Sequence, residues 1–550
     1  MSGTDPVPIP AAVDLVRGAA RTLLQGRSTV REAVRLAKAG VELVRGPVTV
    51  RPDPRDRRFA DPAWALSPIY SRVASLYLQT CRSLDLLLED LEAARGTDES
   101  ARFVVQAAEA LLAPTNQLWG NPAALKHAFD TAGASLVRGA RNALDDLQHN
   151  GGMPSTVDRT ALAVGRDMAV TPGWVVRRDE MAELIAYTPT TAEVRERPLL
   201  VVPPPIGRYY FLDLRPGRSF VEYAVLQGVS THLLSWRNPQ KHQSGWGIDD
   251  YAAQILTAVD AVRQATGSPD VNVVGFCAGG LLTATVLNHL AALGDERIHS
   301  ATLAVTLLDF DAPAPIEAFS APRLLALARS RSDRAGVIDA RSMAAVFAWM
   351  RPNDLIFNYV VANWLRGERP PVFDILAWNA DGTNLPAALH RTFLDCFEDN
   401  LMCEPGALTV LGTPVDLSRI TVPTYVTGAI NDHLTPWRGT YRTTQLLSGP
   451  STYVLSNAGH IQALVNPPGN PKATYTTDGA TDSDPDVWAK AAHTRRGSWW
   501  EHWARWLLER SGAEVPALDP RLRPGFAPLD PAPGRYVHDR GPAAAPGGKH

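Results

Sequence analysis

Cysteine is scarce in this chain of 550 residues, which contains only Cys81, Cys277, Cys396 and Cys403. None of them forms a Cys-x-x-Cys pair, and none has the histidine or cysteine spacing of a zinc site. The sequence therefore predicts neither a disulfide framework nor a metal site. This pattern is typical of a protein of the reducing cytoplasm.

Long apolar runs and a large excess of charge of one sign are also absent. No apolar run reaches the roughly 18 residues of a membrane span, and the N-terminus lacks the basic and apolar pattern of a signal peptide. The formal net charge is −3, which gives no reason to expect nucleic-acid binding. We expect a protein that is neither secreted nor transmembrane.

Helical periodicity dominates the first part of the chain. Two amphipathic patterns in residues 11–48 carry arginine and lysine on their polar sides, and longer patterns follow over about 68–94 and 100–113. A basic amphipathic helix can lie on an anionic or apolar surface, but it can equally present a solvated outer face. We predict an α-helical N-terminal domain over residues 1–185.

Strand-like and helical patterns alternate after about residue 186. Apolar runs at 199–202, 231–236, 271–274, 301–308, 422–428 and 452–456 predict strands, with helical segments such as 249–265 between them. This alternation is typical of a mostly parallel sheet with helices on both faces. We place an α/β domain at 186–515, with a lid or cap insertion at about 310–415 and a disordered, proline- and glycine-rich tail at 516–550.

Cys277 lies in a strand–turn–helix pattern. A predicted strand ends in Gly275-Phe276-Cys277-Ala278-Gly279-Gly280, and an apolar helix follows directly. Gly275 and Gly279 lack the Cβ atoms that would clash in such a sharp turn. The pattern is that of the nucleophile elbow of the α/β-hydrolase fold, with a cysteine in place of the usual serine.

A cysteine nucleophile needs a base, and the base needs a carboxylate to orient it. In this fold they follow the nucleophile in the order acid, then histidine. Asp432 and His460 each come after a predicted strand in this order, and we predict them to be the acid and the base. Asp309 also follows a strand and is an alternative acid. His433, beside Asp432, is an alternative base, but because it shares a loop with the acid we predict that it supports the site.

The negative charge on the acyl oxygen needs two backbone N–H donors. We predict the N–H of Ala278, which follows the nucleophile, and that of Ile206, which follows three prolines after the first predicted strand. Transfer of an acyl group from a thioester to a cysteine gives another thioester, so the group stays activated. The cysteine therefore favours acyl transfer from a thioester over ester hydrolysis.

Several further motifs resemble those of the poly(3-hydroxyalkanoate) synthases. The motifs are 56–64, Pro203-Pro204-Pro205-Ile206, 212–219, Ser235-Trp236-Arg237-Asn238-Pro239, 351–356, Trp378-Asn379, Asp432-His433, Gly459-His460-Ile461, 466–471 and the Gly-x-Cys-x-Gly-Gly box at Cys277. The chain length and residues 346–354 are most similar to the single-subunit, medium-chain-length (class II) type. Phe276 and Ala278 stand where alanine and serine are commoner in that type.

The resemblance implies an acyltransferase that polymerises (R)-3-hydroxyacyl groups from coenzyme A thioesters. The groups would pass through a Cys277 thioester with release of coenzyme A, and no cofactor would be needed. His460 would deprotonate Cys277, and Asp432 would orient His460 or help it to activate the attacking 3-hydroxyl. The family further implies a cytoplasmic homodimer on polyester granules, together with granule-coating proteins, and a granule-associating role for residues 1–185.

Two other functions remain open from the sequence. An acyl-CoA thioesterase or polyester depolymerase would use water as the acceptor on the same scaffold, although a serine would be commoner there. A granule-coating protein would bind polyester without chemistry, and Cys277, Asp432 and His460 would then have no explanation.

Overall fold

The computed structural model describes residues 50–95, 99–311, 322–479 and 482–539, and in these residues the chain divides into two compact units. The helical unit comprises the described residues of 50–159 and 341–373. The sheet unit comprises the described residues of 160–340 and 374–539. The amphipathic patterns of residues 11–48 lie outside the described residues. No described helix is both long and apolar enough to traverse a bilayer.

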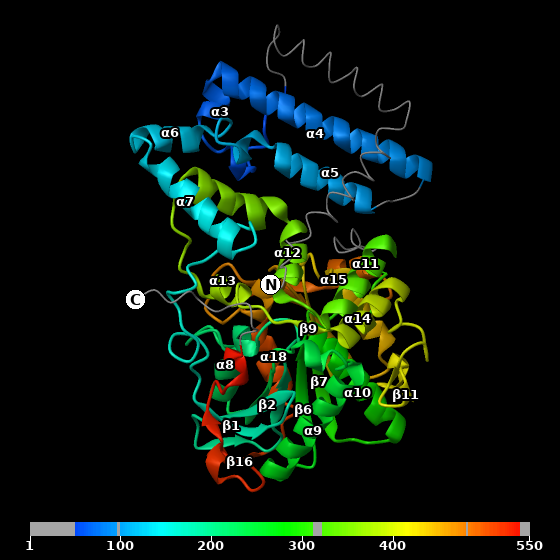
Figure 1. Cartoon of the computed structure of the whole chain (residues 1–550). Helices are drawn as coiled ribbons and strands as arrows, with labels where there is room; N and C mark the ends of the chain where they lie inside the picture. Colours follow the sequence, from blue (N-terminus) through cyan, green and yellow to red (C-terminus); the bar gives the residue numbers. More distant parts are fainter. Residues whose placement is uncertain (1–49, 96–98, 312–321, 480–481, 540–550) are drawn as a thin grey trace. The chain divides into compact units, whose positions relative to one another are not determined.

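The helical unit is built on the two long helices that the sequence predicts, α4 (Pro68–Arg95) and α5 (Glu99–Leu112), together with α6 (Pro122–Asp130) and α7 (Ala134–His149) (Figure 1). One apolar cluster joins Phe59, Trp64 and Tyr77 around the start of α4. A second joins Ala110 of α5 to Ile356, Phe357 and Val360. The segment 341–373 is thus part of the core of this unit.

Within its described residues, the sheet unit contains one eleven-stranded sheet in the order β15-β14-β13-β12-β7-β6-β4-β5-β2-β1-β17. The central strands are parallel: β4 (Leu199–Val202), β5 (Thr231–Trp236), β6 (Val271–Phe276), β7 (Ile298–Ala304), β12 (Thr424–Ala429) and β13 (Ser451–Ser456). These are the six strands that the sequence predicts. The α/β-hydrolase prediction is confirmed.

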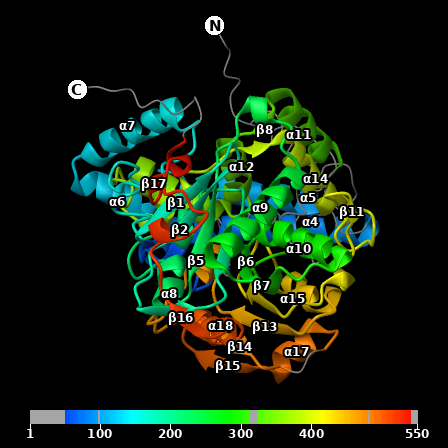
Figure 2. The same cartoon turned by 90° about the horizontal axis from the view of Figure 1, so that it is seen from below.

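Side chains alternate between the two faces along each strand, and both faces of the six central strands are largely buried. Val274 and Phe276 of β6 belong to a cluster with Phe220 of α8 (Phe220–Leu226) and Trp503 of α18 (Trp499–Leu508). The opposite face packs against α9 (Ile248–Thr266), α10 (Ala278–Leu293) and α15 (Trp437–Leu446) (Figure 2). The tryptophan stripe of α18 is core packing, as predicted.

The sheet begins earlier than the predicted boundary at residue 186. β1 (Gly173–Arg178) and β2 (Ala182–Tyr187) are antiparallel strands on the β5 side, and the units divide after Arg159. At the other edge, β14 (Thr474–Thr477) and β15 (His493–Arg496) are also antiparallel. β14 and β15 were missed because they are short and expose polar residues, and the charged residues in Gly173–Arg178 and Ala182–Tyr187 interrupt the apolar run by which the central strands were predicted.

The prediction of a disordered tail from residue 516 is wrong for residues up to 539. β17 (Asp530–Pro531) pairs with β1, and Tyr536 and Val537 are buried. The buried carboxylate of Glu183 accepts hydrogen bonds from the backbone N–H groups of Arg535 and Tyr536. Side-chain anchors of this kind are not visible in a composition rich in proline and glycine.

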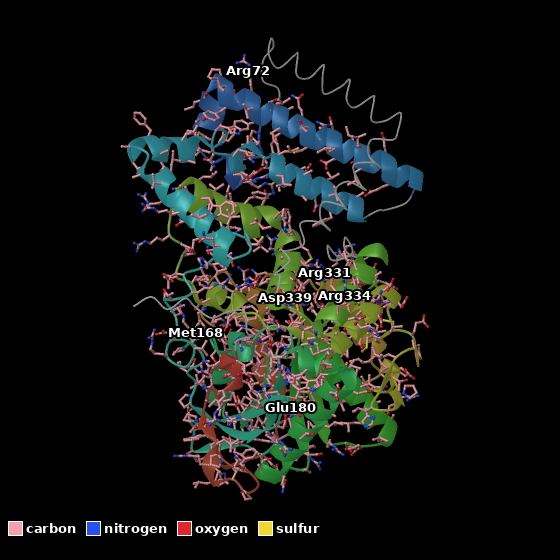
Figure 3. The ribbon with its side chains drawn as sticks, in the orientation of Figure 1. Arg72, Met168, Glu180, Arg331, Arg334 and Asp339 are labelled. Atoms are coloured by element: carbon pink, nitrogen blue, oxygen red, sulfur yellow. The ribbon has the colours of Figure 1, made fainter. Side chains whose placement is uncertain are left out.

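The predicted insertion at 310–415 is divided between the two units. Its described residues in the sheet unit include α11 (Pro322–Ala335), α13 (Asp374–Asn379) and α14 (Ala387–Asp399). Arg329 of α11 is ion-paired with Asp395 and Glu398 of α14, while Arg331 and Arg334 are exposed (Figure 3). That this segment caps the site stays a prediction.

Candidate active site

The predicted site residues come together at the carboxyl ends of neighbouring parallel strands. Cys277 follows β6, Asp432 follows β12, His460 follows β13 and Ile206 follows β4. Because these strands are parallel, their carboxyl ends share one edge of the sheet. The structure therefore gathers at one place residues that span more than 250 positions of the sequence.

Cys277 has the backbone geometry of a nucleophile elbow. Its φ is +50° and its ψ is −123°, in a region that non-glycine residues rarely adopt. Its N–H donates to Ala304 O on β7, and its own carbonyl accepts from Gly280 N at 2.9 Å. These bonds hold the strained residue between β6 and α10, where the sulfur is partly exposed at the start of the helix.

Gly275 and Gly279 are required by close approach rather than by positive φ. An added Cβ on Gly275 would lie 2.6 Å from Gly280 Cα, and one on Gly279 would lie 2.5 Å from Val202 O. The first contact brings β6 against α10 and the second brings α10 against the end of β4. Both glycines thus allow the helix to begin directly beneath the nucleophile.

His460 lies between Asp432 and Cys277. Its Nδ1 is 2.6 Å from Asp432 Oδ2, and both side chains are buried. The histidine begins the short helix α16 (His460–Leu464), which follows β13 directly. The predicted acid and base are therefore in hydrogen-bond contact.

The pKa values of this pair are shifted in opposite directions. Burial alone would lower the pKa of His460, but the Asp432 carboxylate and, more weakly, the Cys277 sulfur raise it to about 10. Burial likewise opposes the lowered pKa of Asp432, which His460 and hydrogen bonds from Thr435 bring below its ordinary value. At neutral pH the proton therefore lies on His460.

Asp432 has further partners that the sequence analysis missed. Its Oδ1 accepts from the N–H groups of Leu434 and Thr435, and its Oδ2 accepts from the Thr435 hydroxyl at 2.8 Å. The Thr435 hydroxyl is also 3.3 Å from His460 Nδ1. An aspartate that bonds backbone N–H groups two and three residues on is a recognisable turn pattern and could have pointed to Thr435.

The alternative acid Asp309 lies elsewhere. Its carboxylate is bonded to Arg442 Nε at 2.9 Å and to Asn400 Nδ2 at 3.0 Å. Those bonds hold the loop after β7, and Asp432 is the carboxylate in contact with His460. His433 is half-buried in the turn that carries Asp432, and its supporting role stays a prediction.

The predicted oxyanion donors lie on either side of the β4–β6 pair. Ile206 is part of the loop after β4, residues 203–208, and Ala278 is the first residue of α10. Neither N–H donates to another residue that the structure describes, whereas the next N–H in the loop, that of Gly207, donates to Thr383 Oγ1. Among the described residues, two backbone N–H groups are thus without a partner, one directly after Cys277 and one in the loop after the neighbouring strand β4.

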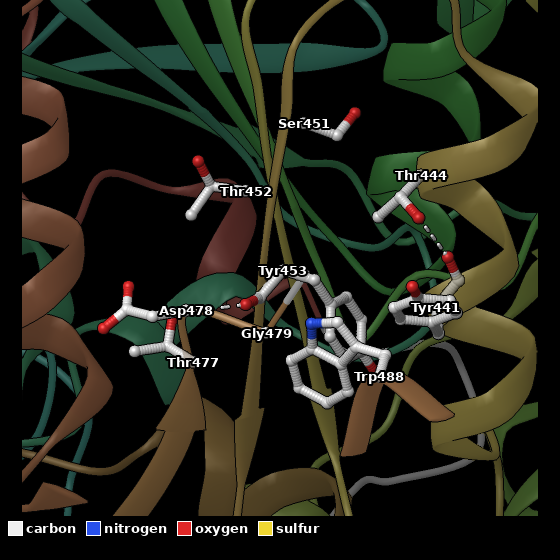
Figure 4. A pocket seen from close by; sticks show the side chains of 9 residues that line it. All are labelled: Tyr441, Thr444, Ser451, Thr452, Tyr453, Thr477, Asp478, Gly479 and Trp488. Carbon is white, nitrogen blue, oxygen red and sulfur yellow. Dashed lines mark hydrogen bonds between the residues drawn. The ribbon is translucent and has the colours of Figure 1, made fainter. Parts of the chain in front are cut away.

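A separate hollow of about 190 Å³ lies at the opposite ends of the strands (Figure 4). It is lined by Tyr441, Thr444, Ser451, Thr452, Tyr453, Thr477, Asp478, Gly479 and Trp488. The Tyr453 and Trp488 rings meet edge to face, with centroids 4.8 Å apart. β13 begins at this hollow, and the residues after its other end lead to His460, so the hollow is distinct from the candidate site.

Among the described residues, no cluster of histidine, cysteine or carboxylate side chains is arranged to hold a metal ion.

The fold and the site define an α/β-hydrolase-fold enzyme with cysteine at the nucleophile position. Residues 217–467 match the family model described as alpha/beta hydrolase fold, and residues 55–224 match that described as Poly-beta-hydroxybutyrate polymerase (PhaC) N-terminus. The second match overlaps the start of the sheet unit.

Whole-chain comparisons give the same family. Poly(3-hydroxyalkanoate) polymerase 1 of Ectopseudomonas oleovorans is 42% identical over 96% of this chain and 95% of its own length. Polymerase 2 of that organism is 43% identical over 90% and 89%. The poly(3-hydroxyalkanoate) polymerase subunit PhaC of Cupriavidus necator is 39% identical over 88% and 83%. The chain belongs to the poly(3-hydroxyalkanoate) polymerase family, as the sequence motifs predict.

Proposed function

We propose that this enzyme polymerises (R)-3-hydroxyacyl groups from coenzyme A thioesters into polyester through a thioester on Cys277. The observation that carries the proposal is the contact chain Asp432–His460–Cys277 at a strained strand–helix turn. The raised pKa of His460 favours the imidazolium form, and in this mechanism the proton that the imidazole takes comes from Cys277, whose sulfur then attacks as the nucleophilic thiolate.

In acylation, the Cys277 thiolate attacks the thioester carbonyl and forms a carbon–sulfur bond. The N–H groups of Ile206 and Ala278 stabilise the oxyanion. When the intermediate collapses, the bond to the coenzyme A sulfur breaks, and the leaving thiolate takes the proton from His460. The products are the acyl enzyme and coenzyme A.

In chain extension, the 3-hydroxyl oxygen of another acyl group attacks the Cys277 thioester. His460, now neutral, accepts the hydroxyl proton as the new carbon–oxygen bond forms. The carbon–sulfur bond then breaks, which gives an ester and returns the Cys277 thiolate. Asp432 stabilises the imidazolium, and the thioester supplies the activation, so that no cofactor takes part.

The proposal also covers the location and the assembly of the enzyme in the cell. The enzyme acts in the cytoplasm as a homodimer at the surface of polyester granules, together with granule-coating proteins, and residues 1–185 support that association. Family membership supports these statements. They are tested by size-exclusion chromatography of the pure enzyme and by imaging of a fluorescent fusion in polyester-forming cells.

The activity is tested with purified enzyme and either 3-hydroxybutyryl-CoA or 3-hydroxyoctanoyl-CoA, with Cys277→Ala alongside. We expect coenzyme A release together with extractable polymer, both absent in the variant. The substrate consumed faster identifies the preferred chain length. If coenzyme A is released together with free acid and without polymer, the enzyme is a thioesterase and not a polymerase. If no coenzyme A release depends on Cys277, only a polyester-binding role is left.

A further inference from the structure

Thr383 is bonded to both neighbours of the predicted oxyanion donor. Its hydroxyl accepts a hydrogen bond from Gly207 N–H at 2.8 Å and donates one to Pro205 O at 3.2 Å. Ile206 is the residue between these two anchoring points. Thr383, which is 5% exposed, therefore bridges the two residues on either side of Ile206.

A second contact fixes the same turn from the same segment of the chain. Trp378 Nε1 donates to Arg208 O at 2.7 Å. The Trp378 ring lies 3.1 Å from the place where a Cβ on Gly207 would stand, and Gly207 has a φ of +89°. Gly207 thus has a backbone conformation that favours glycine. The Trp378 indole would also crowd a Cβ at this position.

We infer that Thr383 is a positioning residue, whose hydroxyl orients the Ile206 N–H toward the oxyanion formed at Cys277. A hydrogen-bond donor stabilises a transition state only if its direction is set before the reaction, so that no reorganisation is needed. The three prolines 203–205 cannot donate backbone hydrogen bonds to fix the loop themselves. The Thr383 hydroxyl supplies bonds that the loop's own backbone lacks.

The inference rests on the proposed function, since it assigns a residue to the acyl transfer at Cys277. It also gives a catalytic reason for the presence of Thr383, which lies more than 100 positions beyond Cys277 in the segment predicted to be a cap. Through Thr383 and Trp378, this segment holds the 205–208 turn that carries the predicted backbone donor.

The test compares Thr383→Val, which keeps the shape and removes the hydroxyl, with Thr383→Ser, which keeps the hydroxyl. Coenzyme A release is measured against the concentration of whichever thioester the wild-type enzyme consumes. We expect Thr383→Val to lower kcat about tenfold or more with KM changed less than about twofold, because the lost interaction acts in the transition state. Thr383→Ser should stay within about threefold of wild type.

Thr392→Val is the matched control, because the Thr392 hydroxyl bonds only Ala388 O within α14; it should leave kcat unchanged. If Thr383→Val does not fold, Thr383→Ala replaces it. A wild-type kcat in a folded variant without the hydroxyl overturns the inference, as does a serine variant that is as slow as the valine variant. Absence of Cys277-dependent release from the wild-type enzyme would instead overturn the proposed function, and the inference with it.

Discussion

At the scale of single residues, the proton on His460 is controlled by the Asp432 carboxylate and by the nearby Cys277 sulfur. The imidazole is 5% exposed, so an isolated charge there would be strongly disfavoured. The 2.6 Å contact with Asp432 reverses that preference, and the Cys277 sulfur adds to it. The Asp432–His460 contact therefore contributes to folding stability.

The first residue-scale prediction concerns the pH dependence of that contribution. The pKa of His460 rises from 6.5 to about 10 on folding, so its stabilisation is fully present below pH 6.5 and is lost as the pH rises toward 10. The pKa of Asp432 is lowered, so its contribution is lost only as the pH falls below its ordinary value of 3.8. We expect Asp432→Asn to destabilise the enzyme by about 3 kcal/mol near pH 6 and by clearly less near pH 10.

Urea unfolding of both proteins at the two pH values measures this difference. Asp486→Asn is the control, because the Arg438–Asp486 pair is about half exposed and should contribute little at either pH. A destabilisation by Asp432→Asn that grows with pH would contradict the assignment of the proton to His460.

At the scale of elements, the backbone geometry around Cys277 depends on how closely α10 approaches the sheet. The helix starts under the end of β4 because Gly279 has no side chain, and it crosses β6 because Gly275 has none. An added Cβ on Gly280 would lie 1.9 Å from the Thr306 hydroxyl, closer still. Three glycines within six residues thus allow the helix and two strands to meet at the nucleophile.

We predict that Gly279→Ala displaces this helix start. The new Cβ would stand 2.5 Å from Val202 O and 2.6 Å from Pro203 O, and these backbone atoms cannot move without shifting β4 and the 203–208 loop. The expected cost is about 2–3 kcal/mol, with loss of most of the coenzyme A release. Chemical denaturation and the release assay measure the two effects.

Gly245→Ala is the matched control, since an added Cβ there meets no atom within 4 Å. It should change stability by less than about 0.5 kcal/mol and leave activity intact. Equal stability of the two alanine variants would show that the close approach at Gly279 is not needed.

At the scale of the whole molecule, late segments of the chain pack against elements formed by much earlier residues. Residues 341–373 complete the helical unit, where Trp364 Nε1 donates to Asp146 at 2.7 Å and Asn142 donates to Asn363 O at 2.9 Å. Within the sheet unit, residues 530–536 complete the edge beside β1. Each unit is thus assembled from segments that are distant in sequence.

The C-terminal segment should therefore contribute to stability. Glu183 is fully buried, and its carboxylate is 2.6 Å from Arg178 Nε and 3.0 Å from the N–H groups of Arg535 and Tyr536. A chain that ends at Leu518 leaves this charge with fewer partners and uncovers β1. We expect its apparent Tm to fall by several degrees, because removing partners of a buried charge costs about 3 kcal/mol or more.

A chain that ends at Asp539 is the control for this truncation, since it keeps every residue described after Leu518. Its apparent Tm should equal that of the full chain. An unchanged Tm in the shorter chain would mean that residues 519–539 add nothing to the fold, as their composition suggests.

Much of the fold and of the candidate site follows from local sequence. The six central strands are apolar runs because both of their faces are buried, and α4, α9, α10 and α18 keep regular helical patterns. Cys277, Asp432 and His460 were predicted because each follows such a strand, and parallel strands carry their ends to one edge. The polar outer strands and the C-terminal segment gave no comparable local signal.

The sequence by itself determined the fold class, the family and the three residues that meet at the carboxyl edge, since each depends on short patterns and their order. Only the tertiary structure decided that Asp432 rather than Asp309 contacts His460, that Thr383 bonds both neighbours of Ile206, and that residues 341–373 belong to the helical unit. These outcomes depend on distances between segments far apart in the chain. Hydrogen bonds and close packing fix such distances in space, and no local pattern encodes them.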